Sequence, residues 1–384
     1  MVANGYAPGE WDRILRFSET QETPFLVVLQ DRIQKKFEAF RAGFPDAKIY
    51  YAVKANPGTE VLVLLRDLGA YFDIASIYEL DQVLALGVSP DRVSFGNTIK
   101  KARHVRQAFE KGVRLFATDS EADVRHLAQF APGSRVFFRL LMDAVTSDSD
   151  WPLSKKFGCQ PRLLMDLVAL AADLELVPYG ISFHVGSQQR EIPAWDAALA
   201  RVSALFGWLR EEGHLLQAIN MGGGFPADYL VQSNPLAVYA EEISRYLAEY
   251  FGNAMPDIYL EPGRGLVGDA GVLVSEVVLI AKKARTDLKR WVYTDVGVFN
   301  GLVETLDESI KYPIHTDRQG ETGGVMLAGP TCDSLDIMYE DYPYQLPLSL
   351  EIGDRLYWLS TGAYTASYSA VEFNGFPPLK TYYL

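Results

Sequence analysis

The feature that most constrains the fold is an alternation of short apolar runs with longer amphipathic stretches over the first two thirds of the chain. The runs are rich in β-branched and aromatic residues, and the stretches between them have helical spacing. The eight candidate strands are 48–55, 71–76, 93–97, 114–119, 136–142, 180–187, 218–224 and 258–261. Gly69, Gly87 and Gly112 stand where three intervening helices should end. This alternation predicts a closed (β/α)8 barrel, a fold that usually spans about 250 residues.

The pattern changes after about residue 265, where strand-like runs follow one another without long helices between them. These runs are 271–284, 290–297, 323–328 and 347–360. A chain of 384 residues also exceeds the usual size of a single hydrophobic core. We therefore predict an α/β barrel over residues 25–265 and a mainly β domain over residues 266–384, with residues 1–24 packing on the β domain.

Polar and glycine residues gather at or just beyond the carboxyl ends of the predicted barrel strands. They are Lys54, Asp73, Asn97, Arg139, His184, Gly222 and Glu261. In such barrels the loops at this end of the strands converge and carry the chemistry. Polar residues scattered through a core would not show this bias, so the sequence predicts an active site at the carboxyl end of the barrel.

Lys54 ends an apolar strand, where an unpaired ammonium is costly to bury. One chemistry that uses such a lysine is a Schiff base with a carbonyl cofactor, since partial desolvation makes the amine nucleophilic. A lone lysine at a strand end more often simply reaches solvent. The motifs that accompany it are Phe183–Ser187, Gly222–Pro226, Glu261–Arg264, Gly329–Asp336 and Gly362–Thr365. Together they supply the parts of a site for pyridoxal 5'-phosphate.

With these motifs the chain resembles the alanine-racemase-fold pyridoxal phosphate decarboxylases, and within that family the ornithine decarboxylase branch. The resemblance extends from Pro24 to Phe376, and the segments 329–336 and 373–376 are its most characteristic parts. It implies an alanine racemase-like fold, pyridoxal 5'-phosphate as cofactor and a basic amino acid as substrate. The product from ornithine would be putrescine, in polyamine biosynthesis, and the product from lysine would be cadaverine.

The resemblance implies roles for the residues around the cofactor. Lys54 would bind its aldehyde, Glu261 would keep the pyridine nitrogen protonated, and His184 would stack on the ring. On the sequence alone Glu261 could instead cap an element or form a surface ion pair, and His184 could be an ordinary core residue. The positions that match cofactor contacts of the family are Lys54, Asp73, Arg139, His184, Ser187, Gly222, Gly223, Gly224, Glu261, Arg264 and Tyr364, with Glu79 near Lys54.

Cys332 is the candidate proton donor, because decarboxylation leaves a carbanion at Cα and a thiol is a suitable acid. An isolated cysteine is usually a small buried hydrophobic residue. The resemblance implies that Cys332 and Asp333 enter the active site from the other subunit, which predicts a homodimer with shared active sites. Cys159, the second cysteine, is expected to play no chemical part.

A basic substrate requires an acidic group for its distal ammonium. Asp333 is one candidate, and Asp307 is favoured over Glu304 as the second, although a solvated acidic turn is an alternative. A diaminopimelate decarboxylase, a catalytically inactive decoy of the antizyme-inhibitor kind, and a racemase or cofactor carrier on the same barrel remain competing interpretations. One methylene group separates ornithine from lysine, so the sequence leaves that choice open, as it does the L or D enantiomer.

Composition narrows the class of protein further. The formal net charge is −13, from 36 basic and 49 acidic residues, which argues against a nucleic-acid surface. Two cysteines give no disulfide framework, and the amino terminus lacks a signal-peptide pattern. We expect a cytoplasmic enzyme with no membrane span and no metal site. The segment Asp143–Trp151 is expected to be a mobile surface loop.

Overall fold

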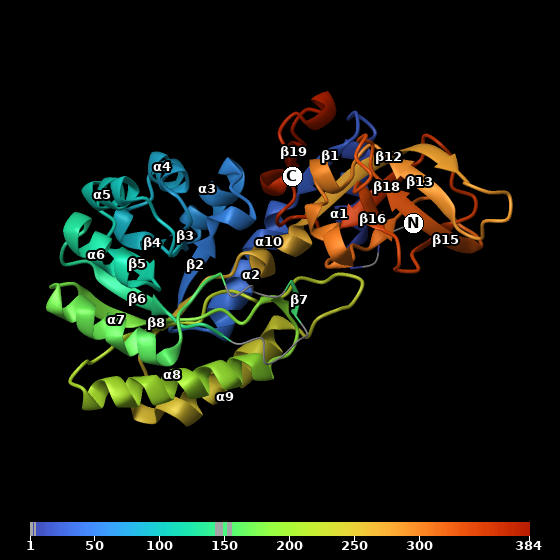
Figure 1. Ribbon diagram of the computed structural model, residues 1–384. Coiled ribbons are helices and arrows are strands. Elements are labelled where there is room, and N and C mark those ends of the chain that lie inside the picture. The colour runs from blue at the N-terminus through green and yellow to red at the C-terminus, as the bar shows by residue number, and fades with distance from the viewer. Residues whose placement is uncertain (1–2, 4, 143–148, 152–155) are drawn as a thin grey trace. The chain divides into compact units, whose positions relative to one another are not determined.

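The computed structural model describes residues 3, 5–142, 149–151 and 156–384. The chain divides into two compact units (Figure 1). The barrel unit comprises Ile33–Pro226 and Ser233–Leu266, and the sheet unit comprises Met1–Arg32, Ala227–Gln232 and Val267–Leu384. Most of the loop predicted to be mobile lies outside the described residues. Its end forms β7 (Ser149–Trp151), which pairs antiparallel with β9 (Ser187–Gln189).

Within the described residues, eight parallel strands close a barrel in the order β10-β11-β2-β3-β4-β5-β6-β8. The strands are β2 (Lys48–Ala52), β3 (Tyr71–Ile74), β4 (Val93–Phe95), β5 (Leu115–Thr118), β6 (Arg135–Arg139), β8 (Val177–Ser182), β10 (Ala218–Asn220) and β11 (Asp257–Leu260). Each overlaps one of the strands predicted from the sequence, so the predicted (β/α)8 barrel is confirmed. Figure 1 shows helices arranged outside these strands.

Three of the helices between the barrel strands end at glycines, as the sequence suggested. Gly69, Gly87 and Gly112 follow α3, α4 and α5 with positive φ, a conformation that glycine adopts without a steric penalty. The α-helices are α1 (Pro8–Ser18), α2 (Gln30–Gly43), α3 (Thr59–Asp67), α4 (Ile77–Ala85), α5 (Ala102–Glu110), α6 (Glu121–Phe130), α7 (Pro161–Asp173), α8 (Pro193–Glu211), α9 (Leu236–Phe251) and α10 (Arg264–Val267). The 3-10 helices are η1 (Val53–Ala55), η2 (Pro90–Arg92), η3 (Gly252–Ala254), η4 (Gly268–Ala270), η5 (Val298–Asn300), η6 (Val303–Glu308), η7 (Ala366–Tyr368) and η8 (Phe373–Gly375).

Tyrosines fill the amino-terminal end of the barrel. The ring of Tyr50 stacks between Tyr71 and Tyr259, with centroids 4.8 and 5.2 Å apart. The hydroxyls of Tyr179 and Tyr259 lie 3.0 Å apart, and Lys48 Nζ donates to Tyr259 at 3.2 Å. Burial raises the pKa of Tyr50 far above its usual range. The barrel is therefore closed at this end by stacked, hydrogen-bonded rings, which leaves the carboxyl end for a ligand.

The sheet unit is built on nine short strands among the described residues. The path runs β14-β18-β12-β13-β15-β16, with β1 pairing β12 and β19, and β17 pairing β15. The strands are β1 (Phe25–Val28), β12 (Gly271–Ala281), β13 (Arg290–Thr294), β14 (Ile314–His315), β15 (Thr322–Ala328), β16 (Ile337–Tyr339), β17 (Gln345–Pro347), β18 (Arg355–Leu359) and β19 (Lys380–Tyr383). The mainly β character predicted for this part of the chain is confirmed.

One element belongs to a different sheet from the one expected. Residues 25–28 had been assigned to the barrel, whereas β1 pairs antiparallel with β12, Phe25 opposite Val274, and parallel with β19. All four side chains of β1 are buried. A short apolar run fits any buried strand, and its periodicity does not identify its partner, so this assignment depends on tertiary contacts.

The amino-terminal helix α1 contributes to the core of the sheet unit. Trp11 is fully buried and its ring makes edge contacts with Tyr6, His315 and Tyr357, at centroid distances of 5.3, 4.8 and 5.2 Å. The guanidinium of Arg32 binds both carboxylate oxygens of Glu10 at 2.7 Å. These contacts fasten α1 to the sheet that contains β1, β12 and β18.

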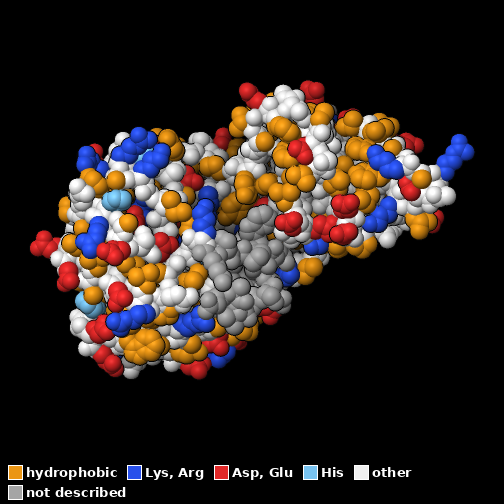
Figure 2. Space-filling view, viewed as in Figure 1, with side chains coloured by type: hydrophobic (Ala, Val, Ile, Leu, Met, Phe, Trp, Pro, Cys, Tyr) orange, Lys and Arg blue, Asp and Glu red, His pale blue; other side chains and the backbone are white. Residues whose placement is uncertain are grey.

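Figure 2 shows acidic and basic side chains interspersed over the visible face of the molecule. Among the described residues, no helix is long and apolar enough to cross a membrane. Within the same residues, no group of three or more His, Cys, Asp or Glu side chains is arranged to hold a metal ion.

A buried ion pair joins three neighbouring barrel elements. The ammonium of Lys100, whose side chain is 0% exposed, donates to the carboxylate of Asp123 at 2.7 Å and to the carbonyls of Asn97 and Ala117 at 3.0 and 2.7 Å. The hydroxyl of Thr118 also donates to Asp123 at 2.7 Å. The pair therefore ties the segment after β4 to β5 and α6.

We predict that Asp123→Ala lowers the free energy of unfolding by about 3–5 kcal/mol, because it leaves the buried ammonium without its counter-ion. Urea unfolding followed by circular dichroism measures this loss. Arg125→Ala on the same helix is the matched control: it breaks an exposed pair with Glu121 and should change the unfolding free energy by less than about 1 kcal/mol. Equal losses in the two variants would contradict the prediction.

Candidate active site

Five of the residues predicted for the site lie at or near the carboxyl ends of barrel strands. Lys54 follows β2 within η1, Asp73 lies within β3, and Arg139 ends β6. His184 lies two residues beyond β8, and Glu261 directly follows β11. Because the strands of the barrel are parallel, these ends meet at one mouth. The structure therefore brings together five residues that are widely separated in the sequence.

Asp73 is buried at this mouth, with 4% of its surface exposed, and its Oδ1 has no hydrogen-bond partner among the described residues. Burial, followed by the nearby Glu261 carboxylate, raises the pKa of Asp73 well above its usual range. The cations Lys54 and Arg139 act in the opposite direction. A buried carboxyl oxygen without a partner marks a position where a ligand donor is expected.

Lys54 is exposed, although its neighbours Val53 and Ala55 are buried. The sequence had suggested a partly desolvated amine, whereas the structure places this side chain in the open mouth of the barrel. Burial raises the pKa of Glu79, while the N–H of Ala75, which donates to Glu79 at 2.6 Å, and the charge of Lys54 lower it. The amine therefore lies in the field of the acidic groups around it.

His184 presents a neutral imidazole. Its Nδ1 accepts the N–H of Gly186 at 3.0 Å, so the proton of the neutral ring is on Nε2. Desolvation, together with the cations Arg139 and Lys54, lowers the pKa of His184 to about 3. A neutral ring in this position suits stacking on a flat ligand better than proton transfer near pH 7.

The three glycines after β10 are required by close contacts with neighbouring backbone. A Cβ on Gly222, whose φ is +65°, would collide with the carbonyl of Phe183, and a Cβ on Gly223 would lie 2.7 Å from the carbonyl of Glu261. The family resemblance implied that these glycines contact the cofactor. The structure adds a second reason: the loop is wedged between the segments that follow β8 and β11.

The same loop adjoins Ser187 and Arg264, two of the other predicted cofactor contacts. Gly224, with φ +94°, accepts the N–H of Gln189 at 2.9 Å, and a Cβ on it would lie 2.7 Å from the carbonyl of Gly186. The buried Arg264 donates from Nε to the hydroxyl of Ser187 at 3.2 Å. Backbone N–H groups, a hydroxyl and a guanidinium thus lie in one neighbourhood, the donor set that an anionic phosphate requires.

Asn220 is a site residue that the sequence analysis missed. It ends β10, is 3% exposed, and its Oδ1 accepts the N–H of Gly222 at 2.9 Å. Its Nδ2 donates to Oε1 of Glu261. The only signal for Asn220 in the sequence was its position two residues before the triple glycine. Its contact with Glu261 could not be predicted, because that contact depends on the pairing of β10 with β11.

Cys332 and Asp333 lie in a loop of the sheet unit that two other side chains hold in place. The N–H of Cys332, an exposed residue, donates to Oδ1 of Asn374 at 2.8 Å. The buried carboxylate of Asp336 accepts the N–H and the hydroxyl of Thr331 at 3.0 and 2.6 Å. Both anchors fall within the motifs quoted from the sequence, although their roles could not be deduced from it.

Asp307 lies on a tight turn of the sheet unit and is exposed. Asp307 and Glu308 have φ values of +53° and +52°, the left-handed region that non-glycine residues rarely adopt. The Glu308 carboxylate accepts the backbone N–H groups of residues 340–342 at 2.7–3.0 Å, which holds the turn in this conformation. Glu304, the alternative substrate contact, is buried.

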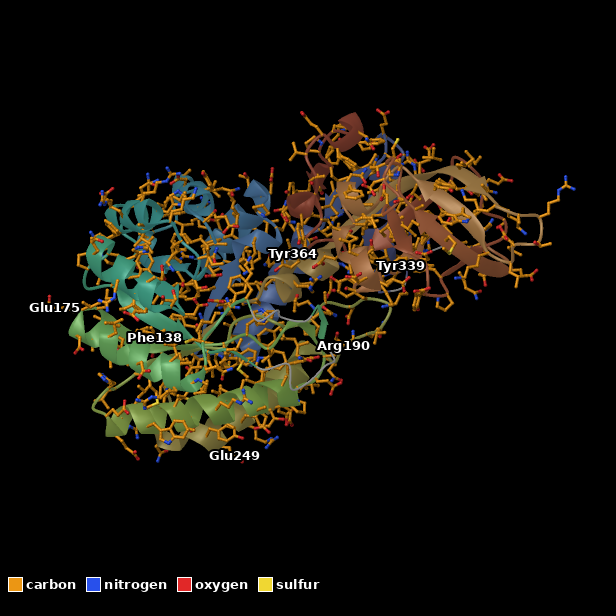
Figure 3. All side chains as sticks on the ribbon, viewed as in Figure 1. Phe138, Glu175, Arg190, Glu249, Tyr339 and Tyr364 are labelled. Atoms are coloured by element: carbon orange, nitrogen blue, oxygen red, sulfur yellow. The ribbon has the colours of Figure 1, made fainter. Side chains whose placement is uncertain are left out.

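Tyr364, labelled in Figure 3, follows β18 in the sheet unit. Its backbone φ is +56°. Cys159 is buried in the barrel unit, and burial raises the pKa of its thiol to about 12. Such a thiol stays protonated at neutral pH and is therefore not a thiolate nucleophile.

The chain resembles known decarboxylases in sequence and in structure. A family profile described as pyridoxal-dependent decarboxylase, pyridoxal binding domain, matches residues 30–268. The lysine/ornithine decarboxylase of Selenomonas ruminantium is 34% identical over 355 residues, which cover 92% of this chain and 88% of that protein. The ornithine decarboxylase of Schizosaccharomyces pombe is 34% identical over 373 residues, 94% of this chain and 83% of that protein. A structure of lysine/ornithine decarboxylase from Vibrio vulnificus complexed with cadaverine has a TM-score of 0.88 and 28% identity, over 98% of this chain and 99% of that one.

We predict that Gly223→Ala weakens binding of pyridoxal phosphate by about tenfold or more, which corresponds to ~1.4 kcal/mol, because the added Cβ displaces the loop from Glu261. Titration of the cofactor-free protein, followed by absorbance, measures the affinity. Gly207→Ala is the matched control: Gly207 lies within α8 with open space around its Cα, so the cofactor affinity should be unchanged. If Gly223→Ala bound the cofactor with wild-type affinity, the glycine loop would be shown to tolerate a side chain at this position.

Proposed function

Since this chain belongs to the pyridoxal-dependent decarboxylases, we propose that it decarboxylates L-ornithine to putrescine and accepts L-lysine, giving cadaverine, as a second substrate. The observation that carries this proposal is the group of Lys54, Asp73, His184 and Glu261 at the mouth of the barrel. Pyridoxal phosphate supplies an aldehyde that condenses with amines and an electron-poor ring that accepts the electron pair left when CO2 departs.

The residues present fit this cofactor. Lys54 supplies the amine that holds the aldehyde, and the neutral face of His184 suits the aromatic ring. The loop Gly222–Gly224, together with Ser187 and Arg264, provides donors for the phosphate. Tyr364 is proposed as an additional phosphate contact from the sheet unit. The unpaired Oδ1 of Asp73 is an acceptor available to a ligand in the same mouth.

Glu261 would keep a proton on the pyridine nitrogen, which strengthens the ring as an electron acceptor. Arg139 lies in the field of both Glu261 and Asp73 and would balance their charge. By the family resemblance, racemases on this barrel place an arginine at the matching position and work with a weaker electron acceptor. The carboxylate at position 261 therefore supports a decarboxylase over a racemase on the same barrel.

Cys332 is proposed as the acid that protonates Cα after CO2 has left, and Asp333 as a neighbouring contact for the substrate. By the family resemblance, both act in the active site of the other subunit, so the working enzyme would be a homodimer with two shared sites. A thiol acid requires a reducing compartment, and we therefore propose that the enzyme works in the cytoplasm.

The distal ammonium of the substrate would be met by Asp307, with Asp333 as the second acidic group. Asp307 is exposed and held on a rigid turn, whereas Glu304 is buried, which favours Asp307 of the two alternatives. A carboxylate in this place would repel the second carboxylate of diaminopimelate and attract a diamine end. The cadaverine in the Vibrio vulnificus structure agrees with a pocket for a diamine. Ornithine and lysine differ by one methylene group, worth only about 1–3 kcal/mol, so both substrates are expected to react.

We predict that the purified protein with pyridoxal phosphate releases CO2 from L-ornithine and L-lysine and not from meso-diaminopimelate. Lys54→Ala should abolish both the release and the visible absorbance of the bound cofactor. Trapping of labelled CO2 from L-ornithine, L-lysine, D-ornithine, L-arginine and meso-diaminopimelate in parallel measures the specificity. Release from diaminopimelate alone would overturn the role given to Asp307, and bound cofactor with no release from any of the five would favour the decoy interpretation.

The shared active site leads to a complementation prediction. Mixing equal amounts of Lys54→Ala and Cys332→Ala protein, with exchange of subunits, should restore about a quarter of wild-type activity, because half of the dimers are mixed and each mixed dimer has one intact site. Putrescine formed per unit time, measured by chromatography, reports the recovery.

The two parent proteins are the controls for this mixture. Lys54→Ala should be inactive alone, and Cys332→Ala should bind the cofactor and release CO2 but form little putrescine, because Cα is not protonated correctly. Activity in the mixture that equals only the mean of the parents would place Lys54 and Cys332 of one site on the same chain. Normal putrescine formation by Cys332→Ala alone would remove the thiol from the mechanism.

A further inference from the structure

Asn220 makes two hydrogen bonds that connect the glycine loop to Glu261. Its Oδ1 accepts the N–H of Gly222 at 2.9 Å, and its Nδ2 donates to Oε1 of Glu261. We propose that Asn220 is a positioning residue, which orients the Glu261 carboxylate toward the ring nitrogen of the cofactor and couples it to the phosphate loop. This inference rests on the proposed function, because it takes the roles of Glu261 and of the glycine loop as given there.

The arrangement of protons at Asn220 is fixed by its neighbours. A backbone N–H can only donate, so the N–H of Gly222 identifies the side-chain oxygen of Asn220 as the atom that faces it. The amide nitrogen must then face Glu261, and the Glu261 oxygen beside it must accept. One oxygen of the carboxylate is thereby occupied by a neutral donor, and the other is left to accept a proton donor from a ligand.

The location of Asn220 makes this connection rigid. It is the last residue of β10, is 3% exposed, and lies in register with Ser182 of β8 and Tyr259 of β11. Its side chain is therefore confined by burial as well as by the two hydrogen bonds. A displacement of the glycine loop would move Asn220, and Asn220 would move Glu261.

Charge explains why a neutral amide fits this position. Glu261 already acts electrostatically on the buried carboxyl of Asp73 and on the guanidinium of Arg139. Lys54 and Glu79 also act on Asp73 within the same mouth. A further carboxylate against Glu261 would add repulsion between like charges, whereas an amide donates a hydrogen bond and leaves the net charge unchanged.

Asn220→Asp separates the hydrogen bond to Gly222 from the hydrogen bond to Glu261. The aspartate has the same side-chain shape and keeps the acceptor for the N–H of Gly222, but it lacks the amide donor for Glu261. At acidic pH the new carboxyl pair shares a proton and retains a hydrogen bond. As the pH rises, that proton is lost, two carboxylates face each other, and the orientation of Glu261 is no longer maintained. The defect of this variant should therefore grow with pH.

The test measures the affinity of the full-length, cofactor-free protein for pyridoxal phosphate between pH 6 and pH 8.5, as the ratio of wild type to variant at each pH. Taking the ratio removes the titration of the cofactor itself. We expect a ratio near one at pH 6 and about tenfold weaker binding by the variant at pH 8.5, equivalent to ~1.4 kcal/mol. A ratio that does not change with pH would overturn the inference.

A cofactor analogue in which carbon replaces the ring nitrogen distinguishes orientation of Glu261 from damage to the phosphate loop. The affinity loss caused by Asn220→Asp at pH 8.5 should be much smaller for this analogue, since the analogue has no ring N–H for Glu261 to accept. An equal loss for both compounds would assign Asn220 a purely structural role.

Asn300→Asp is the matched control for replacing a buried asparagine. Asn300 also accepts a backbone N–H, that of Gly297 at 2.6 Å, and donates to the carbonyl of Asp295 at 3.1 Å, but it lies in the sheet unit. Its cofactor affinity should show no dependence on pH relative to wild type. The proposed function fails separately, if the wild-type protein releases no CO2 from ornithine or lysine. An active wild type with a pH-independent Asn220→Asp defect refutes only the role of Asn220.

Discussion

The pairing of β11 with β2, which places Tyr259 beside Lys48, closes the barrel, and the active site depends on that closure. Lys54 follows one of these two strands and Glu261 follows the other. Without the closing ladder, the amine that would hold the cofactor and the carboxylate that would control its ring nitrogen would lie at opposite edges of an open sheet. With it, residues from the beginning and the end of the barrel sequence share one mouth.

The two ends of the barrel differ in their main polar groups: neutral tyrosine hydroxyls at the amino end and charged side chains at the carboxyl end. At the amino end, the hydroxyls of Tyr179 and Tyr259 bond to each other, and burial raises the pKa of both. At the carboxyl end, Asp73 and Glu261 lie close enough to raise the pKa of Asp73, and the cations Lys54 and Arg139 offset them. A group of charges this concentrated is unfavourable for an empty core, and its retention is expected where a charged ligand completes it.

The sequence was sufficient to predict the barrel and the residues of its mouth, because both depend on local patterns. The periodicity and the length of the apolar runs identify the barrel strands. Because these strands are parallel, Lys54, Asp73, His184 and Glu261 lie at the same end of the barrel. Contacts between distant segments were not predictable: β1 pairs with β12 in the sheet unit, although its apolar run fitted the barrel equally well.

The same limit applies to the residues that hold the site in place. Asn220, Asn374 and Glu308 each bond to a residue 32 or more positions away in the sequence, and nothing in their residue types distinguishes them from ordinary loop residues. The exposure of Lys54 was also not foreseen, because a strand pattern says nothing of where the strand ends. The residues proposed to react could be predicted from their residue types and positions. The residues that hold them in place could be identified only from the three-dimensional structure.

The loops of the sheet unit are held by the same means as the barrel mouth, with a buried or bonded polar side chain fixing a neighbour that is proposed to react. Asp336 and Asn374 hold the loop of Cys332, and Glu308 holds the turn of Asp307 in a left-handed conformation that costs about 1–3 kcal/mol to maintain. An acidic turn that only faced solvent would not need to be held in one conformation, because an exposed carboxylate is hydrated equally well in any orientation. The fixed turn at Asp307 therefore argues that its direction matters, as it would for a carboxylate that must meet an ammonium at a set distance from the reacting carbon.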